Sequence, residues 1–174
     1  IDRQKTETVH WHAVFTASRA EKKVRDRLEE LGVECFLPVQ TVLRQWTYRK
    51  SRVVVPVIAG LVFVRVGRQE QVKVLQTKGV VAFLRLKGEA GAAVIPDKQM
   101  EDFRFLLDFS EEAVEMTNEN IKAGDLVRVV KGSLRGMEGE LIRHKGVTKV
   151  LVRIDMLGCA MVNIPASFVE KLNK

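Results

Sequence analysis

The stretch His10-Trp11-His12-Ala13-Val14-Phe15, followed at once by Thr16-Ala17-Ser18-Arg19-Ala20-Glu21, decides how the first part of the chain is interpreted. β-forming residues alternate in the first stretch, which predicts a strand. Ser18 is a favoured N-cap residue and Glu21 three positions later completes a capping box, so a helix is expected to begin there. An apolar stripe at helical spacing follows, formed by Val24, Leu28 and Leu31. Gly32 lies where this helix is expected to end.

The rest of the first half alternates between strand and helix patterns. Further strands are expected over residues 34–38, 41–48, 52–56, 61–66 and 80–86. A short helix is expected over residues 69–77, and Pro96-Asp97 opens a third helix with Met100, Phe103 and Leu107 on one face. The order β-α-β-β-β-α-β-α predicts an α+β fold, in which helices cover one side of a mixed or antiparallel sheet.

The composition changes after the third predicted helix. Residues 108–119 include five acidic residues and no basic one. This predicts a solvated, mobile linker over residues 110–122, after a first domain over residues 8–109. Short alternating apolar runs separated by glycine-containing turns then follow. Four or five short strands in about 50 residues predict a small β-barrel over residues 123–174.

Composition limits the classes of protein that fit. The chain has 174 residues, 46% of them hydrophobic, which suits one or two small folded domains. Its two cysteines, Cys35 and Cys159, form no Cys-x-x-Cys pair, so zinc ribbons and thioredoxin-like motifs have no support. The longest apolar run, residues 53–66, is interrupted by Pro56 and Gly60 and is shorter than the roughly 18 residues of a membrane span. Because no signal-peptide pattern opens the sequence, a cytoplasmic protein without a membrane partner is expected.

A cluster of basic residues points to a polyanionic partner. The formal net charge is +7 and the sequence pI is about 9.6. Cations gather in one segment that has no acidic residue, around Trp46 and Tyr48: Arg44, Arg49, Lys50 and Arg52. Because cations bind phosphates and aromatic rings stack on bases, contact with DNA or nascent RNA is expected. A solvated hairpin that is basic by chance is the alternative.

The sequence has no signature of an enzyme. His10 and His12 share a face of the first strand, as two metal ligands could, but no third ligand lies at a recognisable spacing. The glycine-rich segment 132–139 lacks the Gly-Lys-Ser/Thr of a phosphate-binding loop, and no Gly-x-Ser-x-Gly elbow is present. Catalysis, a metal and an organic cofactor are therefore not expected.

Five segments of the first half carry a family resemblance. They are Trp11-His12-Ala13-Val14, the amphipathic helix from Glu21 to Leu31, Phe36-Leu37-Pro38, Leu61-Val62-Phe63-Val64 and Gly79-Val80-Val81-Ala82-Phe83-Leu84. Together they resemble the N-terminal domain of the NusG family, called the NGN domain. The resemblance implies an NGN fold with a mixed or antiparallel sheet and helices.

The C-terminal part carries a second resemblance. Gly124-Asp125-Leu126-Val127-Arg128-Val129, followed by Gly132 to Gly139, is similar to the G-D-x-V-R-V…G-x-x-x-G-x-x-G pattern of KOW domains, and the closing residues 162–172 are similar to the end of the same motif. This implies a small SH3-like KOW β-barrel. KOW motifs also occur in ribosomal proteins, whereas the order NGN, acidic linker, KOW is typical of NusG-like proteins.

Three departures from the general family pattern favour a specialised paralogue of the UpxY or RfaH kind. The tyrosine of the family's opening Trp-Tyr-x-Val is His12 here. The Pro-Gly-Tyr before the central strand is Ala59-Gly60-Leu61. The Phe-Gly-Arg of the barrel loop is Leu157-Gly158-Cys159.

The resemblance implies a monomeric transcription elongation or antitermination factor. In the family the NGN domain binds the clamp helices of RNA polymerase through an apolar depression and suppresses pausing or termination. Carried over by position, the polymerase-binding residues are His12, Phe15, Ile58, Ala59 and Leu61.

The remaining sites implied by the resemblance lie on the basic segment and on the barrel. The basic segment from Arg44 to Arg52 would face nucleic acid, and Met156 and Leu157 would contact a further protein partner of the KOW domain, unless they serve ordinary barrel packing. The alternative function is that of a KOW-type RNA- or ribosome-binding protein.

Overall fold

The computed structural model describes residues 7–172, and its chain divides into two compact units. Among these residues, unit 1 contains the chain up to Leu37 together with Ile58–Asp97, and unit 2 contains Pro38–Val57 together with the chain from Lys98 onward. The hairpin and third helix expected in the first domain thus group with the C-terminal strands. The predicted α+β class, with helices and antiparallel sheets before a β-rich C-terminal part, is confirmed.

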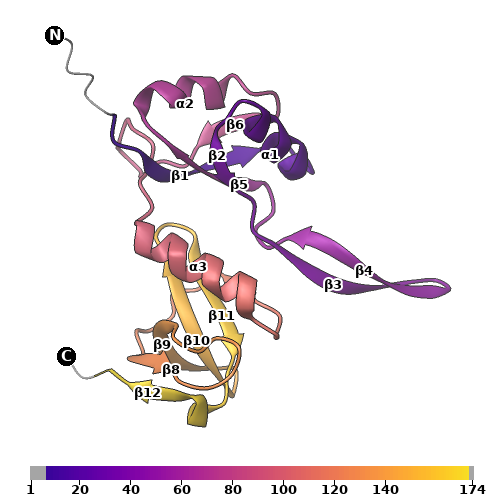
Figure 1. The fold of residues 1–174 in the computed structure, drawn as a ribbon, viewed down its shortest axis with the longest axis vertical. Helices are drawn as coiled ribbons and strands as arrows, with labels where there is room; N and C mark the ends of the chain where they lie inside the picture. Colours follow the sequence, from indigo (N-terminus) through magenta and orange to yellow (C-terminus); the bar gives the residue numbers. More distant parts are fainter. Residues whose placement is uncertain (1–6, 173–174) are drawn as a thin grey trace. The chain divides into compact units, whose positions relative to one another are not determined.

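Unit 1 is built on a four-stranded antiparallel sheet with the strand order β2-β5-β1-β6 (Figure 1). Its strands are β1 (His10–Thr16), β2 (Glu34–Phe36), β5 (Leu61–Val66) and β6 (Val80–Phe83). The two central strands pair from His10↔Val66 to Phe15↔Leu61. Five of the six residues of β5 are buried, because both faces of this strand are covered.

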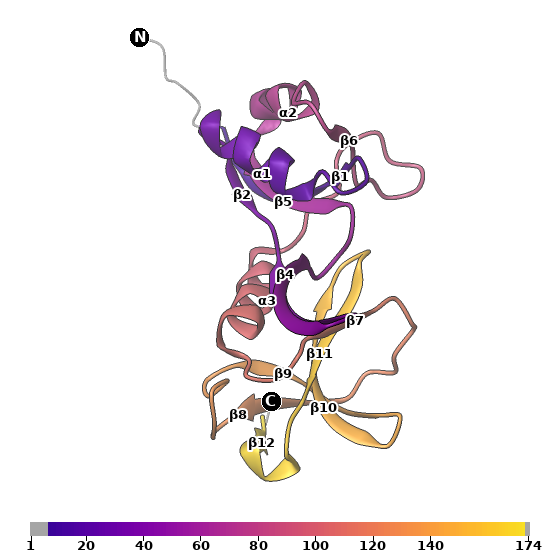
Figure 2. The ribbon, with the colours of Figure 1, turned by 90° about the vertical axis from the view of Figure 1, so that its right-hand side faces the viewer.

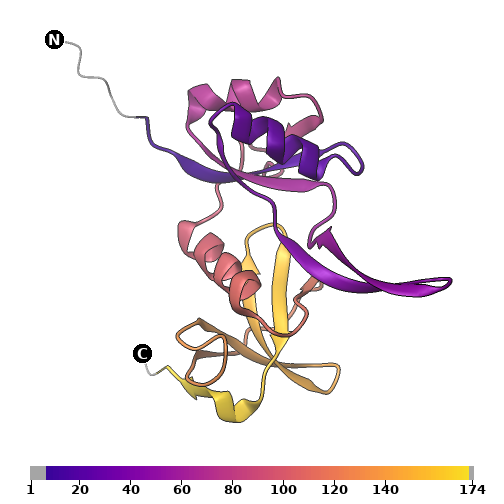
Figure 3. The same cartoon turned by 45° about the vertical axis from the view of Figure 1, so that its right-hand side comes forward.

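Two helices lie on the same side of this sheet (Figure 3). They are α1 (Glu21–Glu30) and α2 (Arg68–Leu75), which contribute the fully buried Val24, Leu28 and Val74 to the core. The end of α1 confirms the prediction from Gly32, which adopts a φ of +74°. The Gly32 N–H donates to the Glu29 carbonyl at 2.9 Å and the Val33 N–H to the Leu28 carbonyl at 3.0 Å, the pattern of a Schellman motif.

The predicted start of α1 was wrong. Ser18 is not the N-cap, because the helix begins at Glu21 with Ala20 at the capping position and no capping hydrogen bond from a side chain. Ser18 instead lies in a turn that the Ala20 N–H closes on the Ala17 carbonyl at 3.1 Å. Glu21 does not complete a capping box either, since its carboxylate accepts a hydrogen bond from the Gly60 N–H.

Unit 2 begins with a long hairpin, β3 (Val39–Trp46) and β4 (Arg49–Pro56), which projects as a two-stranded ribbon (Figure 1). Later in the chain comes α3 (Asp97–Phe109). The predicted apolar face of α3 is confirmed at Met100 and Phe103, but its third buried residue is Leu106, while Leu107 is half-buried.

The β-rich part of unit 2 is a six-stranded antiparallel sheet with the order β12-β8-β9-β10-β11-β7. Figure 2 shows the sheet strongly curved. A 3-10 helix, η1 (Ala166–Phe168), precedes the last strand. The strands are β7 (Glu115–Thr117), β8 (Asp125–Val129), β9 (Glu138–His144), β10 (Val147–Ile154), β11 (Gly158–Asn163) and β12 (Val169–Lys171).

The segment predicted as a mobile linker contains β7, which pairs with β11 from Glu115↔Met161 to Thr117↔Cys159. The buried ammonium of Lys149 donates to the Glu115 carboxylate at 3.0 Å. Gln40 donates to the Val114 carbonyl at 3.2 Å and accepts from the Val114 N–H at 3.1 Å. The prediction of a mobile linker is therefore wrong for residues 115–117. The acidic composition suggested solvation, but it did not reveal that Glu115 has a partner.

Candidate functional site

The first candidate surface lies at one end of the central strands of unit 1. Phe15 on β1 is directly opposite Leu61 on β5 and Ala82 on β6, so the three residues form one row across the sheet. Phe15 is 41% exposed, although it belongs to a central strand, whereas Leu61 is buried. An exposed aromatic ring in a central strand is typical of a surface that another protein can cover.

The loop that precedes β5 borders this row. Ile58 is half-buried and Ala59 is exposed. Gly60 follows with a φ of +72°, a conformation that favours glycine. The Thr16 N–H donates to the Gly60 carbonyl at 2.9 Å, which places the loop beside the end of β1. We call the accessible residues Phe15, Ile58, Ala59 and Ala82, together with the buried Leu61 opposite Phe15, the docking patch.

His12 supports unit 1 from inside. Its side chain is 3% exposed, its Nδ1 lies 2.8 Å from the Ala93 carbonyl, and its ring meets the Phe83 ring edge-on. The carbonyl can only accept, so Nδ1 carries a proton and donates. Burial lowers the pKa of His12 below its ordinary value, which favours the neutral ring, and the hydrogen bond to Ala93 opposes that effect. His12 and Leu61, both assigned to the polymerase-binding set from the sequence, thus lie beneath the surface, while Phe15, Ile58 and Ala59 reach it.

The second candidate surface is the distal half of the β3–β4 hairpin. Strand alternation places its four predicted basic residues on two opposite faces. Arg44, Trp46 and Arg49 share one face, which we call the tryptophan face. Lys50 and Arg52 share the other with Leu43, which we call the lysine face. The sequence had suggested one patch, because the four cations are close along the chain.

Trp46 is held in place on its face. Its indole N–H donates to the Ser51 hydroxyl at 2.7 Å, across the hairpin, and its side chain is 51% exposed. Tyr48, at the turn, is 98% exposed. Within residues 7–172 none of the hairpin's four cations lies within ion-pair distance of a carboxylate. Their charges therefore remain available to an anionic ligand.

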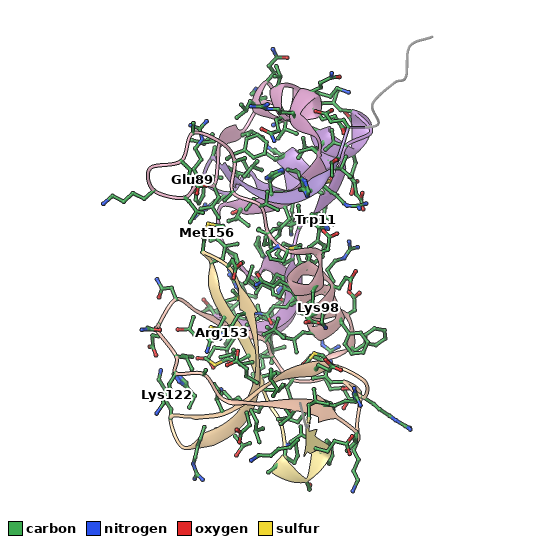
Figure 4. All side chains as sticks on the ribbon, turned by 90° about the vertical axis from the view of Figure 1, so that its left-hand side faces the viewer. Trp11, Glu89, Lys98, Lys122, Arg153 and Met156 are labelled. Atoms are coloured by element: carbon green, nitrogen blue, oxygen red, sulfur yellow. The ribbon has the colours of Figure 1, made fainter. Side chains whose placement is uncertain are left out.

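The third candidate surface is the turn between β10 and β11. Figure 4 shows Met156 at the tip of the hairpin that these two strands form. Met156 is exposed and adopts a φ of +68°, while Leu157 is half-buried and donates its N–H to the Ile154 carbonyl at 3.0 Å. Gln99 of α3 donates to the Asp155 carboxylate at 2.9 Å and accepts from the Asp155 N–H at 2.7 Å. These two hydrogen bonds hold the turn against α3, which belongs to the same unit.

Over residues 7–172 the remaining histidine, cysteine and carboxylate side chains form no metal-binding cluster. In the part of the chain that the structure describes, no three His, Cys, Asp or Glu residues are placed to hold a metal ion. Burial raises the pKa of the Cys35 thiol to about 11, and its Sγ lies 3.7 Å from the Arg25 carbonyl. No described helix is long and apolar enough to span a bilayer.

Two residues of unit 1 were missed or misassigned from the sequence. Ala82 completes the row beside Phe15, but a small residue in a strand gives no signal of its own. Glu21 had a signal, because a glutamate at that distance from a serine suits a capping box, and that signal led to the wrong partner. The contact between Glu21 and Gly60 can be seen only in the three-dimensional structure, because the two residues are 39 positions apart in the sequence.

Comparison with known proteins identifies the family of this chain. The family model described as "Transcription termination factor nusG" matches residues 9–104. The solved structure described as "Domain interaction in Thermotoga maritima NusG" is similar with a TM-score of 0.51 and 22% sequence identity, over 95% of this chain and 98% of that chain. A chain of the MjSpt4:Spt5 complex matches with a TM-score of 0.29 and 17% identity, over 94% and 99% of the two chains. No curated protein matches significantly. Because the family model covers more than half of the chain, the protein belongs to the NusG family of transcription factors.

Proposed function

We propose that this protein binds RNA polymerase through the docking patch and acts as an elongation or antitermination factor that suppresses pausing or termination. The observation that carries the proposal is the exposed Phe15 ring between Leu61 and Ala82, on a rigid central strand within the region that the family model matches. The clamp helices of the polymerase are the proposed contact. An apolar patch with an aromatic anchor is the usual centre of a protein–protein interface.

The proposed mechanism requires no chemical step by this chain. A protein that binds one conformation of the polymerase better than another shifts the population toward that conformation by its difference in affinity. Contact with the clamp would favour the closed, processive state over the open, paused state. The buried β1–β5 pair makes the patch rigid, so little conformational freedom is lost on binding.

The hairpin supplies the proposed contact with DNA or nascent RNA. Arg44, Arg49, Lys50 and Arg52 have no carboxylate partner among the residues that the structure describes, and the exposed Trp46 ring can stack on a base. Stacking needs an unpaired base, so the aromatic residue favours single-stranded over fully paired nucleic acid.

The C-terminal strands supply the proposed second protein contact, through Met156 and Leu157. In this proposal residues 8–109 form the NGN domain, 110–122 the connection and 123–174 the KOW domain. A second contact on the same chain raises the effective concentration once the first is made. We place the protein, as a monomer, in the cytoplasm. The departures at His12, in Ala59-Gly60-Leu61 and in Leu157-Gly158-Cys159 support a specialised paralogue.

The decisive test is Ile58→Asp, which puts a charge into the docking patch. The matched control is Val72→Asp, since Val72 is an exposed apolar residue on α2 of the same unit. Binding of the full chain to purified RNA polymerase is expected to fall at least about tenfold for Ile58→Asp, as for an interface hot spot, and to remain unchanged for Val72→Asp. Equal binding by both variants would show that the docking patch is misassigned. Tight binding to structured RNA together with no binding to polymerase would favour the KOW-type RNA- or ribosome-binding function.

A further inference from the structure

Glu21 is a buried carboxylate at the start of α1 whose partner lies outside its helix. The side chain is 8% exposed, and its Oε1 accepts a hydrogen bond from the Gly60 N–H at 2.8 Å. A first-turn glutamate can stabilise a helix from the solvent through the helix dipole, without being buried. Burial of a carboxylate costs free energy unless the charge is satisfied, so the position of Glu21 requires a specific partner.

That partner lies in the loop of the docking patch. Gly60 is held at both of its backbone groups: its N–H by Glu21, and its carbonyl by the Thr16 N–H at 2.9 Å. Its φ of +72° gives the sharp turn that leads directly into Leu61. Ile58 and Ala59, the two accessible loop residues of the patch, immediately precede this fixed point.

We infer that Glu21 is the positioning residue of the docking patch: its carboxylate fixes the Ile58–Gly60 loop in the conformation that a partner protein recognises. This inference rests on the proposed function for the identity of the partner, but the effect on the loop does not. A hydrogen bond from an N–H to an ionised carboxylate is stronger than one between neutral groups. A loop fixed before binding loses less entropy when the partner covers it.

The loop itself gives a readout that needs no polymerase. In the full chain labelled with ¹⁵N, Glu21→Ala is expected to shift the Gly60 amide resonance and to raise its hydrogen-exchange rate about tenfold or more, because the charged acceptor is lost. Glu21→Gln keeps an oxygen acceptor of the same shape and is expected to give an intermediate effect. It also provides a variant that preserves packing if Glu21→Ala does not fold.

The control separates this effect from the general role of a first-turn acid. Glu70 occupies the first turn of α2, where it supplies the same type of helix–charge interaction. Glu70→Ala is expected to leave the Gly60 amide and polymerase binding unchanged. An unchanged Gly60 amide in Glu21→Ala would overturn the inference.

A double-mutant cycle with Ile58→Ala tests whether Glu21 acts through the loop. The single Glu21→Ala change is expected to weaken polymerase binding roughly tenfold. In the Ile58→Ala background it should weaken binding much less, because the side chain that Glu21 helps to place is already missing. Equal weakening in both backgrounds would overturn the inference, since a general loss of stability would act equally on each.

The two proposals can fail separately. If the unaltered protein does not bind polymerase, the proposed function fails, and the Gly60 amide still decides whether Glu21 fixes the loop. If the unaltered protein binds polymerase, Ile58→Asp abolishes binding and Glu21→Ala does not affect it, the docking patch stands and the role of Glu21 is refuted.

Discussion

Two antiparallel pairs of strands in this protein have similar ladders and opposite environments. β3 and β4 pair over eight residues and β1 and β5 over six, both without a break in register. The β1–β5 pair is almost completely buried, whereas the distal half of the β3–β4 pair is exposed on both faces. The backbone pairing therefore determines which residues lie opposite each other. Only burial of their side chains makes a pair of strands part of the hydrophobic core.

The difference lies in the side chains. β5 has the sequence LVFVRV, with apolar residues on both faces, while the end of the hairpin has LRQW facing RKSR. An isolated two-stranded hairpin is marginally stable in water, so a long exposed one has little structural use. We therefore expect the first pair to contribute most to stability and the second to make the proposed contact with nucleic acid.

The largest expected effect is that of Phe63→Ala on stability. Phe63 is fully buried in β5 and stacks on Phe36 with ring centroids 6.3 Å apart. Its truncation is expected to reduce the free energy of unfolding by about 3–5 kcal/mol, measured by denaturant unfolding. The matched hairpin change, Leu43→Ala at an exposed position, is expected to cost less than about 0.5 kcal/mol. Similar losses for both would contradict the division between core and ligand-binding ladder.

The second effect is that of Trp46→Ala in the hairpin, where the expected loss is in nucleic-acid binding and not in stability. Trp46→Ala is expected to leave stability nearly unchanged and to weaken single-stranded DNA or RNA binding by about 1–3 kcal/mol, the contribution of one stacked base. Ser51→Ala removes only the acceptor of the indole N–H and should weaken binding less. The measurement is fluorescence anisotropy of a labelled oligonucleotide at constant salt. Unchanged affinity in Trp46→Ala would remove the stacking role.

A smaller effect distinguishes the two faces of the hairpin. The double variant Arg44→Gln with Arg49→Gln neutralises the tryptophan face, and Lys50→Gln with Arg52→Gln neutralises the lysine face. If the strand follows Trp46, the first variant should reduce the slope of log affinity against log salt by about 0.7 for each lost phosphate contact, and the second should reduce it less. Equal slopes would mean that both faces contact phosphates.

The sequence predicted most of the strands and helices because their signals are local. Alternation predicted β1 and the hairpin, helical spacing predicted α1, and Gly32 marked the end of α1, since each depends on neighbouring residues. Apart from local errors at Ser18 and Leu107, the failures depended on partners distant in the sequence. β7 was predicted as linker because its pairing with β11 and the ion pair of Glu115 with Lys149 join residues far apart in the chain.

The same distinction applies to the candidate site. The resemblance to a family named Phe15 and the 58–61 loop, but it could not separate the exposed Phe15 from the buried His12 and Leu61. The basic segment was found from composition, whereas the split between Arg44 and Arg52 depends on strand register. Glu21 required the tertiary structure, because its partner is 39 residues away.

The smallest expected effect concerns the pH dependence of stability in the buried β1–β5 pair. His12 is a titratable side chain inside the buried pair, opposite Val64, and burial holds its pKa below the ordinary value of 6.5. The unfolded chain therefore binds a proton more readily than the folded one as the pH falls below 6.5. The contribution of the neutral His12 to stability is fully present above pH 6.5, decreases as the pH falls toward the lowered folded pKa, and is lost below it.

His12→Phe removes this titration and keeps an aromatic ring beside Phe83. The melting temperature of the unaltered protein is expected to decrease as the pH falls below 6.5, and the decrease should be smaller in His12→Phe. The comparison variant is His10→Gln. Because the charge of the exposed His10 is only the smallest of the three causes that act on the pKa of His12, this change should leave most of the decrease in place. An identical decrease in all three proteins would show that the buried ladder is not what titrates, and acid sensitivity would then have to come from carboxylates such as that of Glu115, whose pKa the hydrogen bond from Lys149 lowers.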